Sequence, residues 1–480
     1  MNEPRHTYPP IAPSEKPTDT DVDTIVAVAT PSGFGGIGIV RLSGPRALKI
    51  GLSLFSPAAT PGDNTTSPTP RTAHVGSFRD EEGHTIDRGL LLFMPGPASY
   101  TGEDVVELHG HGSPLVMEQL LFHAVARGAR IAEGGEFTRR AFMNGKLDLV
   151  QAEAVADLIY ASSTAAVHIA TAQHEGGLSH ALGEISDALV VLLSDLEAAV
   201  DFPDEEHDHP SSEPFFDRII EIQTRVERLL DTFRRGRILR EGARVVIVGR
   251  PNVGKSSIMN LLLERPRSIV TEEPGTTRDT IEELLVIGSV PVRLIDTCGI
   301  REALSPPEKE GVMRTMRAVE EADLVLVVTE ADRPMSADER VLLDDIDEHR
   351  TIVVCNKVDL VPGGPESFSP PDTSRTTVVT SATLPYGIDE LITAVQRRLT
   401  APASLRSEEQ IVVSNARHFA ALSEARTSLD EAAASAARGE SPEFVSVDVR
   451  GALAFLGDIT GVVTADDVLE VIFSRFCVGK

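Results

Sequence analysis

The segment Gly-Arg-Pro-Asn-Val-Gly-Lys-Ser at residues 249–256 restricts the fold of this chain more than any other feature. It follows the stretch 244–248 (RVVIV), which is apolar after its first residue and predicts a buried strand, and it precedes a stretch with helical periodicity. Glycines let the backbone wrap around phosphate groups, while amides at the start of a helix point toward negative charge. We therefore expect a phosphate-binding loop in which Lys255 neutralises the β and γ phosphates and Ser256 binds Mg²⁺.

Four further motifs follow in the order of a GTP-binding domain. Residues 275–279 (GTTRD) supply a threonine for Mg²⁺ and the γ-phosphate, and residues 296–299 (DTCG) place Asp296 near Mg²⁺ at the end of a strand. Residues 356–359 (NKVD) place a carboxylate where it accepts hydrogen bonds from guanine N1–H and N2–H, a donor edge that adenine lacks. Residues 381–383 (SAT) are expected to support the base. The predicted GTP-binding residues are Asn252, Val253, Gly254, Lys255, Ser256, Ser257, Thr271, Glu272, Glu273, Pro274, Gly275, Thr276, Thr277, Asp296, Thr297, Cys298, Gly299, Asn356, Lys357, Asp359, Ser381, Ala382 and Thr383.

The group that positions the attacking water must come from another position than in the commonest small GTPases. Ile300 follows Gly299, where many small GTPases carry a glutamine that positions water. Glu308 lies where a second switch helix should begin, and the residues alone support two interpretations equally: a catalytic carboxylate, or one that satisfies the helix dipole. The side-chain oxygen of Asn252 lies beside the phosphates and can hold a monovalent cation, which could replace an arginine finger.

The composition excludes several classes of protein. The 480 residues hold 45 Lys and Arg against 73 Asp and Glu, a net charge of −28, so a simple basic nucleic-acid coat protein is excluded. Three distant cysteines imply neither a disulfide framework nor a zinc knuckle. No apolar leader and no run of 18 apolar residues is visible, which predicts a cytoplasmic protein with no membrane partner.

Periodicity predicts several domains. The expected order is a disordered tail (1–21), a mixed α/β domain (22–145), the first part of a helical domain (146–240), a doubly wound α/β domain (241–398) and the second part of the helical domain (399–480). Long helices are predicted over 148–175, 178–200, 212–236 and 407–437, with shorter ones over 447–456 and 465–476. The GTP-binding unit is therefore expected to be inserted between two halves of one helical domain.

Motifs outside the GTP-binding unit carry a resemblance that covers residues 22–480. The chain resembles the family of tRNA modification GTPases called MnmE or TrmE. The residues that carry this resemblance are ATP (29–31), GGIGIVR (35–41), YTGEDVVEL (100–108), HGHG (109–112), GEFTRRAF (135–142), KLDL (146–149), DFPDEE (201–206) and FCVGK (476–480).

The resemblance implies an N-terminal domain similar to tetrahydrofolate-binding folds, which forms a homodimer and binds 5-formyltetrahydrofolate as one-carbon donor. The matching positions are Arg41, Glu107, Lys146 and Lys480. Glu107 can take the pterin's N–H donors, and the basic groups can face the folate carboxylates. Without the family, surface charge would be the simpler interpretation of the three basic residues.

For the GTP site, the resemblance implies activation by potassium when two G domains meet. K⁺ is implied at Asn252, Thr271, Glu273 and Thr276, Mg²⁺ at Ser256 and Thr277, and Glu308 is implied to orient the attacking water. The family works with an FAD-containing partner, MnmG or GidA, in a heterotetramer. Together they add an aminomethyl or carboxymethylaminomethyl group to C5 of the wobble uridine of certain tRNAs.

Two alternatives remain open at this point. A GTP-switched RNA-binding or ribosome-assembly module would carry a basic RNA-binding segment, which is not visible, and no folate site. A folate-dependent one-carbon transferase with a regulatory GTPase would act without the flavoprotein. Cys477 is expected to be a buried or anchoring residue rather than a reactive thiol, because no base adjoins it in the sequence.

Overall fold

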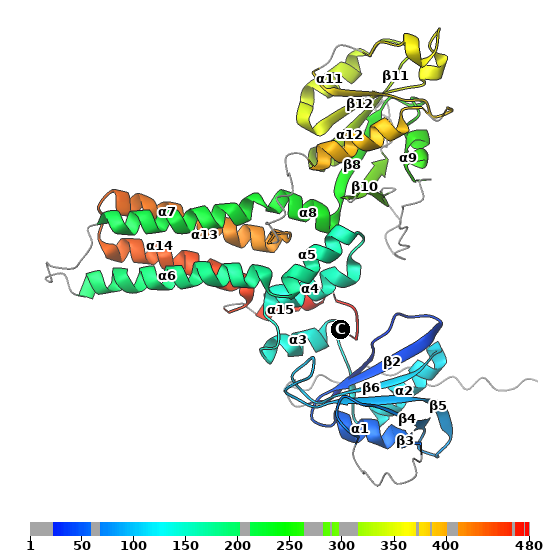
Figure 1. Cartoon of the computed structure of the whole chain (residues 1–480), viewed down its shortest axis with the longest axis vertical. Coiled ribbons are helices and arrows are strands. Elements are labelled where there is room, and N and C mark those ends of the chain that lie inside the picture. Colours follow the sequence, from blue (N-terminus) through cyan, green and yellow to red (C-terminus); the bar gives the residue numbers. More distant parts are fainter. Residues whose placement is uncertain are drawn as a thin grey trace, which may run out of the picture. The chain divides into compact units, whose positions relative to one another are not determined.

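The computed structural model describes residues 23–58, 68–201, 212–263, 282–288, 290–296, 315–370, 374–384, 386–400, 411–462, 466–474 and 476–479. The chain divides into two compact units, shown in Figure 1. The first, called here the N-terminal unit, comprises residues 1–153 and 460–480. The second, called the central unit, comprises residues 154–459. Two segments far apart in the sequence therefore build the N-terminal unit.

The N-terminal unit is built around a seven-stranded sheet with the spatial order β3-β4-β5-β6-β2-β1-β7. Its strands are β1 (Ile25–Val28), β2 (Gly35–Ser43), β3 (Phe55–Pro57), β4 (Ala73–Arg79), β5 (Thr85–Met94), β6 (Val105–Gly112) and β7 (Arg130–Ile131). Its helices are α1 (Ala47–Leu54), α2 (Pro114–Ala126), α3 (Glu136–Met143) and α15 (Asp466–Phe473), and α4 (Leu149–Tyr160) begins in this unit. Apart from the parallel β1–β7 pair, the neighbouring strands are antiparallel.

Both faces of this sheet are apolar near β1. Val26 points into a core that α1 and α2 cover, together with Leu108 of β6. Ile25 and Ala27 point the other way and pack with Phe137 of α3. Because successive side chains of a strand alternate between faces, β1 is apolar throughout and buried on both sides.

Charged side chains hold α3 in place together with the buried Phe137. Glu136 is buried and accepts hydrogen bonds from Arg130 Nη2 at 2.6 Å and Arg140 Nη2 at 3.1 Å. Both arginines also bind Asp23, each at 2.5 Å, and Arg140 pairs with Glu103 at 3.1 Å. Burial alone raises the pKa of Glu136, but hydrogen bonds from Arg130 and the Glu133 backbone, with the charges of both arginines, lower it overall. The network therefore needs an ionised Glu136.

Glu136→Gln should lower the free energy of unfolding of the N-terminal unit by about 3 kcal/mol at neutral pH, because two guanidiniums lose their shared carboxylate. A carboxyl with a lowered folded pKa stabilises the fold above its unfolded pKa, near 4.5, and loses that contribution as the pH falls through the folded value. The difference between wild type and variant should therefore shrink below about pH 4.5. Denaturant unfolding followed by circular dichroism measures it, with exposed Glu118→Gln as control. A difference that stays constant with pH would contradict the argument.

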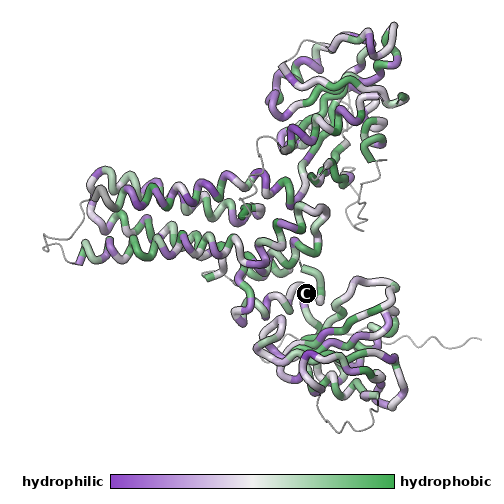
Figure 2. Tube along the Cα trace, in the orientation of Figure 1, coloured by the Kyte–Doolittle hydropathy of each residue, from purple (hydrophilic) through white to green (hydrophobic). Residues whose placement is uncertain are grey.

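The central unit joins a helical bundle to an α/β domain. The bundle helices are α5 (Thr164–His174), α6 (Gly177–Asp201), α7 (Ser212–Asp231), α8 (Phe233–Glu241), α13 (Ala416–Ala437) and α14 (Pro442–Thr460). The helix α7 packs against α6 and α13, and Arg450 of α14 pairs with Glu197 of α6 at 2.6 Å. Hydrophilic and hydrophobic residues alternate along these helices in Figure 2, as the predicted amphipathic pattern requires.

Within the described residues, α6 is the one helix long and apolar enough to cross a membrane by length and composition. Its buried residues recur every three or four positions, at Leu178, Leu182, Ile185, Leu189, Leu192 and Leu196. This spacing places one apolar stripe against the neighbouring helices, which is typical of a bundle helix.

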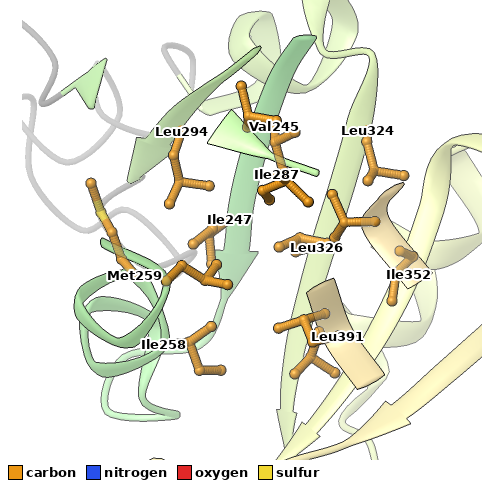
Figure 3. Packing of buried hydrophobic residues seen from close by; sticks show 14 of the residues in the cluster. Val245, Ile247, Ile258, Met259, Ile287, Leu294, Leu324, Leu326, Ile352 and Leu391 are labelled. Carbon is orange, nitrogen blue, oxygen red and sulfur yellow. The ribbon is translucent and has the colours of Figure 1, made fainter. Parts of the chain in front are cut away.

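The α/β domain of the central unit contains a six-stranded sheet with the order β13-β12-β11-β8-β10-β9. Its elements are β8 (Ala243–Gly249), α9 (Lys255–Leu263), β9 (Glu282–Ile287), β10 (Val290–Asp296), β11 (Leu324–Glu330), α11 (Ala337–Asp345), β12 (Thr351–Asn356), β13 (Thr376–Val379) and α12 (Ile388–Thr400). All strands are parallel except β9. Figure 3 shows Ile258 and Met259 of α9 and Leu391 of α12 packed against the strands. The expected combination of an α+β domain, helices and a doubly wound unit is confirmed.

Several predicted helices have different bounds. The stretch 148–175 forms two helices, α4 and α5, because the Ser163 hydroxyl caps α5 by accepting from the Ala166 backbone N–H at 3.1 Å. The stretch 212–236 likewise forms α7 and α8, which meet at Thr232. The helix expected from 407 begins at Ala416, where the Asn415 side chain accepts from the Arg417 N–H at 3.0 Å.

Candidate functional site

The loop between β8 and α9 has backbone conformations that explain its glycines. Gly249 and Gly254 have φ angles of 151° and 99°. A Cβ on Gly249 would overlap the carbonyl oxygen of Val328, and one on Gly254 would overlap the side-chain amide of Asn356. Both positions therefore need glycine for conformation and for space. The predicted strand–loop–helix context of this motif is confirmed.

The structure describes two side chains of this loop for which the sequence predicts ligand contacts, Lys255 and Asn252. Lys255 is buried at the first position of α9, and its Nζ donates to the carbonyl oxygens of Gly249 at 3.1 Å and Arg250 at 3.0 Å. Its positive charge is therefore held against the loop. Asn252 has a left-handed φ of 64° and an exposed side chain. Ser256 and Ser257 follow Lys255 in the exposed first turn of α9.

The end of β12 is tied to the phosphate-binding loop. Asn356 is fully buried, and its Nδ2 donates to the Val253 carbonyl at 2.8 Å, while its Oδ1 accepts from the Thr380 hydroxyl at 3.3 Å. The next residue, Lys357, has a φ of 63°, and its ammonium pairs with Glu330 at the end of β11. The sequence did not point to Glu330, since a lone carboxylate at a strand end carries no pattern.

The carboxylate of Asp359 is oriented by two hydroxyls. Its Oδ1 accepts from Ser381 at 2.6 Å and its Oδ2 from Thr383 at 3.0 Å. The hydrogen bond from Ser381 is the largest cause that lowers the pKa of Asp359, and the one from Thr383 adds to it. The group is therefore an ionised acceptor with both oxygens fixed, which suits a base edge that offers two N–H donors.

Other predicted residues of this site lie outside the described residues. They are Thr271, Glu272, Glu273, Pro274, Gly275, Thr276, Thr277, Thr297, Cys298, Gly299 and the catalytic candidate Glu308. The backbone of Asp296 is described as the last residue of β10, where it is paired in register with Ile247 of β8. This strand end lies next to the strand that leads into the phosphate-binding loop.

A second cluster lies in the N-terminal unit. Arg41 of β2 and Glu107 of β6 are paired in register, and Arg41 Nε donates to Glu107 Oε1 at 2.9 Å. The other carboxylate oxygen, Oε2, is 3.0 Å from Nε2 of His109. Arg41 Nη1 also donates to the Gly479 carbonyl at 3.3 Å. Burial alone raises the pKa of Glu107, but the hydrogen bond from His109 and the charge of Arg41 lower it overall.

The remaining predictions for this cluster have mixed outcomes. Lys146 is exposed, and its side chain makes no hydrogen bond or ion pair to any residue that the structure describes. Lys480 is outside the described residues, whereas its neighbour Gly479 contacts Arg41. Cys477 is exposed, so the expectation that it is buried was wrong. Its backbone carbonyl accepts from Gly135 N–H at 3.4 Å, which is compatible with the other expectation, an anchoring residue.

The sequence pointed to Arg41 and Glu107 but not to two of their neighbours. His109 lies two residues after Glu107 on one strand, so the alternation of strand side chains could have placed both on one face. The ring of Phe137 lies 5.8 Å from the Arg41 guanidinium carbon. No local pattern indicates that contact, because the two residues belong to elements far apart in the sequence.

Comparison with protein families gives two matches that together span nearly the whole chain. A model of the GTP-binding protein TrmE N-terminus matches residues 24–146. A model of the MnmE helical domain matches residues 149–477.

Curated relatives agree with these matches. The tRNA modification GTPase MnmE of Syntrophotalea carbinolica is 45% identical over 459 residues, which cover 95% of this chain and 99% of the relative. The protein of the same name from Geobacter metallireducens is 42% identical over 464 residues, with the same coverage of both chains. Among solved structures, Era of Aquifex aeolicus bound to GDP·AlF4⁻ is 27% identical over 39% of this chain and 66% of Era, with a TM-score of 0.28. The G domain of the T. maritima FeoB iron transporter is 25% identical over 32% of this chain and 98% of that domain, with a TM-score of 0.26.

Proposed function

Because this chain belongs to the MnmE, or TrmE, family of tRNA modification GTPases, and is therefore a GTP hydrolase of tRNA modification, we propose a specific reaction for it. The protein is a cytoplasmic, potassium-activated GTPase that forms a homodimer and acts with the FAD-containing partner MnmG, or GidA, in a heterotetramer. Together they modify C5 of the tRNA wobble uridine with a one-carbon unit from 5-formyltetrahydrofolate, and this chain contributes GTP hydrolysis.

One observation supports this proposal: the chain has two separate clusters of polar and charged side chains that could bind ligands, one in each unit, here called the first and the second centre. The central unit contains the phosphate-binding loop and the oriented carboxylate of Asp359. The N-terminal unit contains the partly buried Arg41–Glu107–His109 cluster. A simple GTP-driven RNA-binding switch needs only the first centre, so the second favours a reaction with its own small-molecule donor.

Metal ions fit the residues of the GTP site. The Ser256 hydroxyl follows the buried Lys255 at the start of α9, where it could bind Mg²⁺ together with Thr277. The exposed amide oxygen of Asn252 suits K⁺, together with Thr271, Glu273 and Thr276. Bound cations supply positive charge for the phosphates, and Glu308 orients the attacking water.

A reduced folate fits the charge and hydrogen-bonding capacity of the second centre. A carboxylate offers about four acceptor sites. Among the described residues, the Glu107 carboxylate accepts two hydrogen bonds, from Arg41 and His109. The remaining capacity suits the adjacent N–H donors of a pterin ring, while Lys146 and Lys480 supply positive charge for the folate's carboxylates.

Reconstitution tests this function. Purified protein, the flavoprotein partner, unmodified tRNA, GTP and 5-formyltetrahydrofolate should together yield the modified wobble nucleoside, measured by mass spectrometry of digested tRNA. Omission of the flavoprotein, of GTP or of the folate should each abolish the product. Product without the flavoprotein would favour a one-carbon transferase, and product without folate would remove the proposed donor.

A further inference from the structure

The carboxylate of Glu107 is held from two sides by two different kinds of donor. Arg41 donates to Oε1 from the neighbouring strand, while His109 binds Oε2 from the same strand, at 2.9 and 3.0 Å. Residues two apart on a strand share a face, so Glu107 and His109 belong to one polar row. Arg41 is further held by the Gly479 carbonyl. The position of Oε2 therefore depends on His109 rather than on the arginine.

The hydrogen bond to Glu107 determines which ring nitrogen of His109 carries a hydrogen. An ionised carboxylate can only accept, and the pKa of Glu107 lies below its usual value, so Nε2 of His109 carries the donated hydrogen. In the neutral ring the other nitrogen, Nδ1, is then an acceptor. One quarter of the His109 side chain is exposed. The pair thus offers acceptors from both a carboxylate and an imidazole.

Apolar and aromatic residues flank this polar row. Ile39 on β2 and Leu90 on β5 are the register partners of His109 on its two neighbouring strands. Phe137 lies under the Arg41 guanidinium at 5.8 Å. Tyr100 packs against the cluster that contains Phe137. Burial raises the pKa of the Tyr100 hydroxyl, although the hydrogen bond with Thr138 and the charge of Arg41 oppose that rise. Apolar neighbours beside a row of acceptors suit a planar heterocycle whose edge carries N–H donors.

We propose that His109 is a positioning residue for the pteridine ring of a reduced folate, and that it acts by fixing Glu107 Oε2 toward the ring's N–H donors. This inference rests on the proposed function, since it assumes that the second centre binds a folate. Loss of the imidazole frees Oε2 to rotate and leaves Arg41 as the one described residue that binds the carboxylate.

Binding of 5-formyltetrahydrofolate to the full-length protein tests the proposal by isothermal titration calorimetry, without turnover. His109→Ala should raise the dissociation constant about tenfold or more, as expected for the loss of a hydrogen bond to a charged group. His109→Gln can still donate an N–H to Glu107 and should stay within about threefold of wild type. The matched control is His84→Ala, which removes an exposed imidazole from Asp80 in the same unit, 3.2 Å away, and should change binding less than about twofold.

The outcomes separate this proposal from the proposed function. Folate binding by the wild type that persists unchanged in His109→Ala overturns the role of His109 alone. Equal loss in the alanine and glutamine variants also overturns it, because the hydrogen bond to Glu107 would then not be the cause. No folate binding by the wild type overturns both the folate site and the inference. The circular dichroism spectra and thermal unfolding of all three variants should match those of the wild type and show that the fold is intact.

Discussion

Potassium is expected to raise the rate of GTP hydrolysis by this protein about 100-fold or more over sodium at equal ionic strength, since an arginine finger supplies about 10³–10⁵ in related reactions. The sequence has Ile300 where a glutamine would position water, so the water-positioning group must come from elsewhere, and a bound cation would supply the positive charge that an arginine finger gives in related enzymes. Asn252 lies within the phosphate-binding loop, with an exposed side chain and a left-handed backbone conformation. An ion of suitable size held there would stabilise the charge that develops on the phosphates.

Two variants separate the ion from the water-positioning group. Asn252→Ala should lose the potassium response while its rate in sodium changes little. Glu308→Ala should lower turnover about 100-fold or more in either salt while nucleotide binding persists. Glu310→Ala, which removes a nearby acidic residue of the same segment, is the matched control and should keep its activity. Equal wild-type rates in potassium and sodium would contradict the cation mechanism and indicate an external activator.

Asp359→Asn should change the base that the protein binds. Both oxygens of Asp359 are oriented by Ser381 and Thr383, so in the proposed complex each would accept from one N–H donor of the guanine edge. Asparagine keeps one acceptor and places an N–H₂ group against a guanine N–H. The affinity for GDP should fall about 100-fold or more, since hydrogen bonds to a charged group contribute about 1.5–3 kcal/mol each. Xanthosine diphosphate, which presents a carbonyl at that position, should bind better to the variant than to the wild type.

Fluorescent nucleotide binding measures both affinities. Asp344→Asn is the matched control, because it makes the same substitution at an exposed position on α11 of the same domain. GDP affinity that is unchanged in Asp359→Asn would show that the base is recognised by other residues. A loss of both GDP and xanthosine diphosphate binding, with a lowered melting temperature, would instead indicate that Asp359 maintains the local fold.

The sequence predicted the nucleotide-binding domain well because its constraints are local. Gly249 and Gly254 belong to one contiguous motif and have positive φ angles, so the sequence alone reveals them, although the close contacts that also require glycine come from Val328 and Asn356 on neighbouring strands. The helix α3 was not predicted, because its buried face mixes the charged Glu136 and Arg140, which are held by ion pairs, with only two buried apolar residues, Phe137 and Ala141. The strand β4 was also missed, because only Gly76 and Phe78 along it are buried.

The second centre was predictable only in part. The resemblance supplied Arg41 and Glu107, and their pairing across β2 and β6 supports the view that they act together. His109 could have been added from the two-residue period of a strand. The contact between Gly479 and Arg41 could not have been predicted in this way, because 437 residues separate the two positions and no local rule connects them.

The N-terminal unit also has a consequence for biosynthesis. Residues 154–459 are synthesised between its two segments, so the ribosome must add about 306 residues before residues 460–479 can join it. At about 5–20 residues per second, this takes roughly 15–60 s. During that interval the sheet of β1 to β7 lacks α15, and Arg41 lacks its contact with Gly479. The nucleotide-binding domain of a nascent chain can therefore fold before the Arg41–Glu107–His109 cluster is complete. During this part of translation, chaperones or proteases can act on the incomplete N-terminal unit.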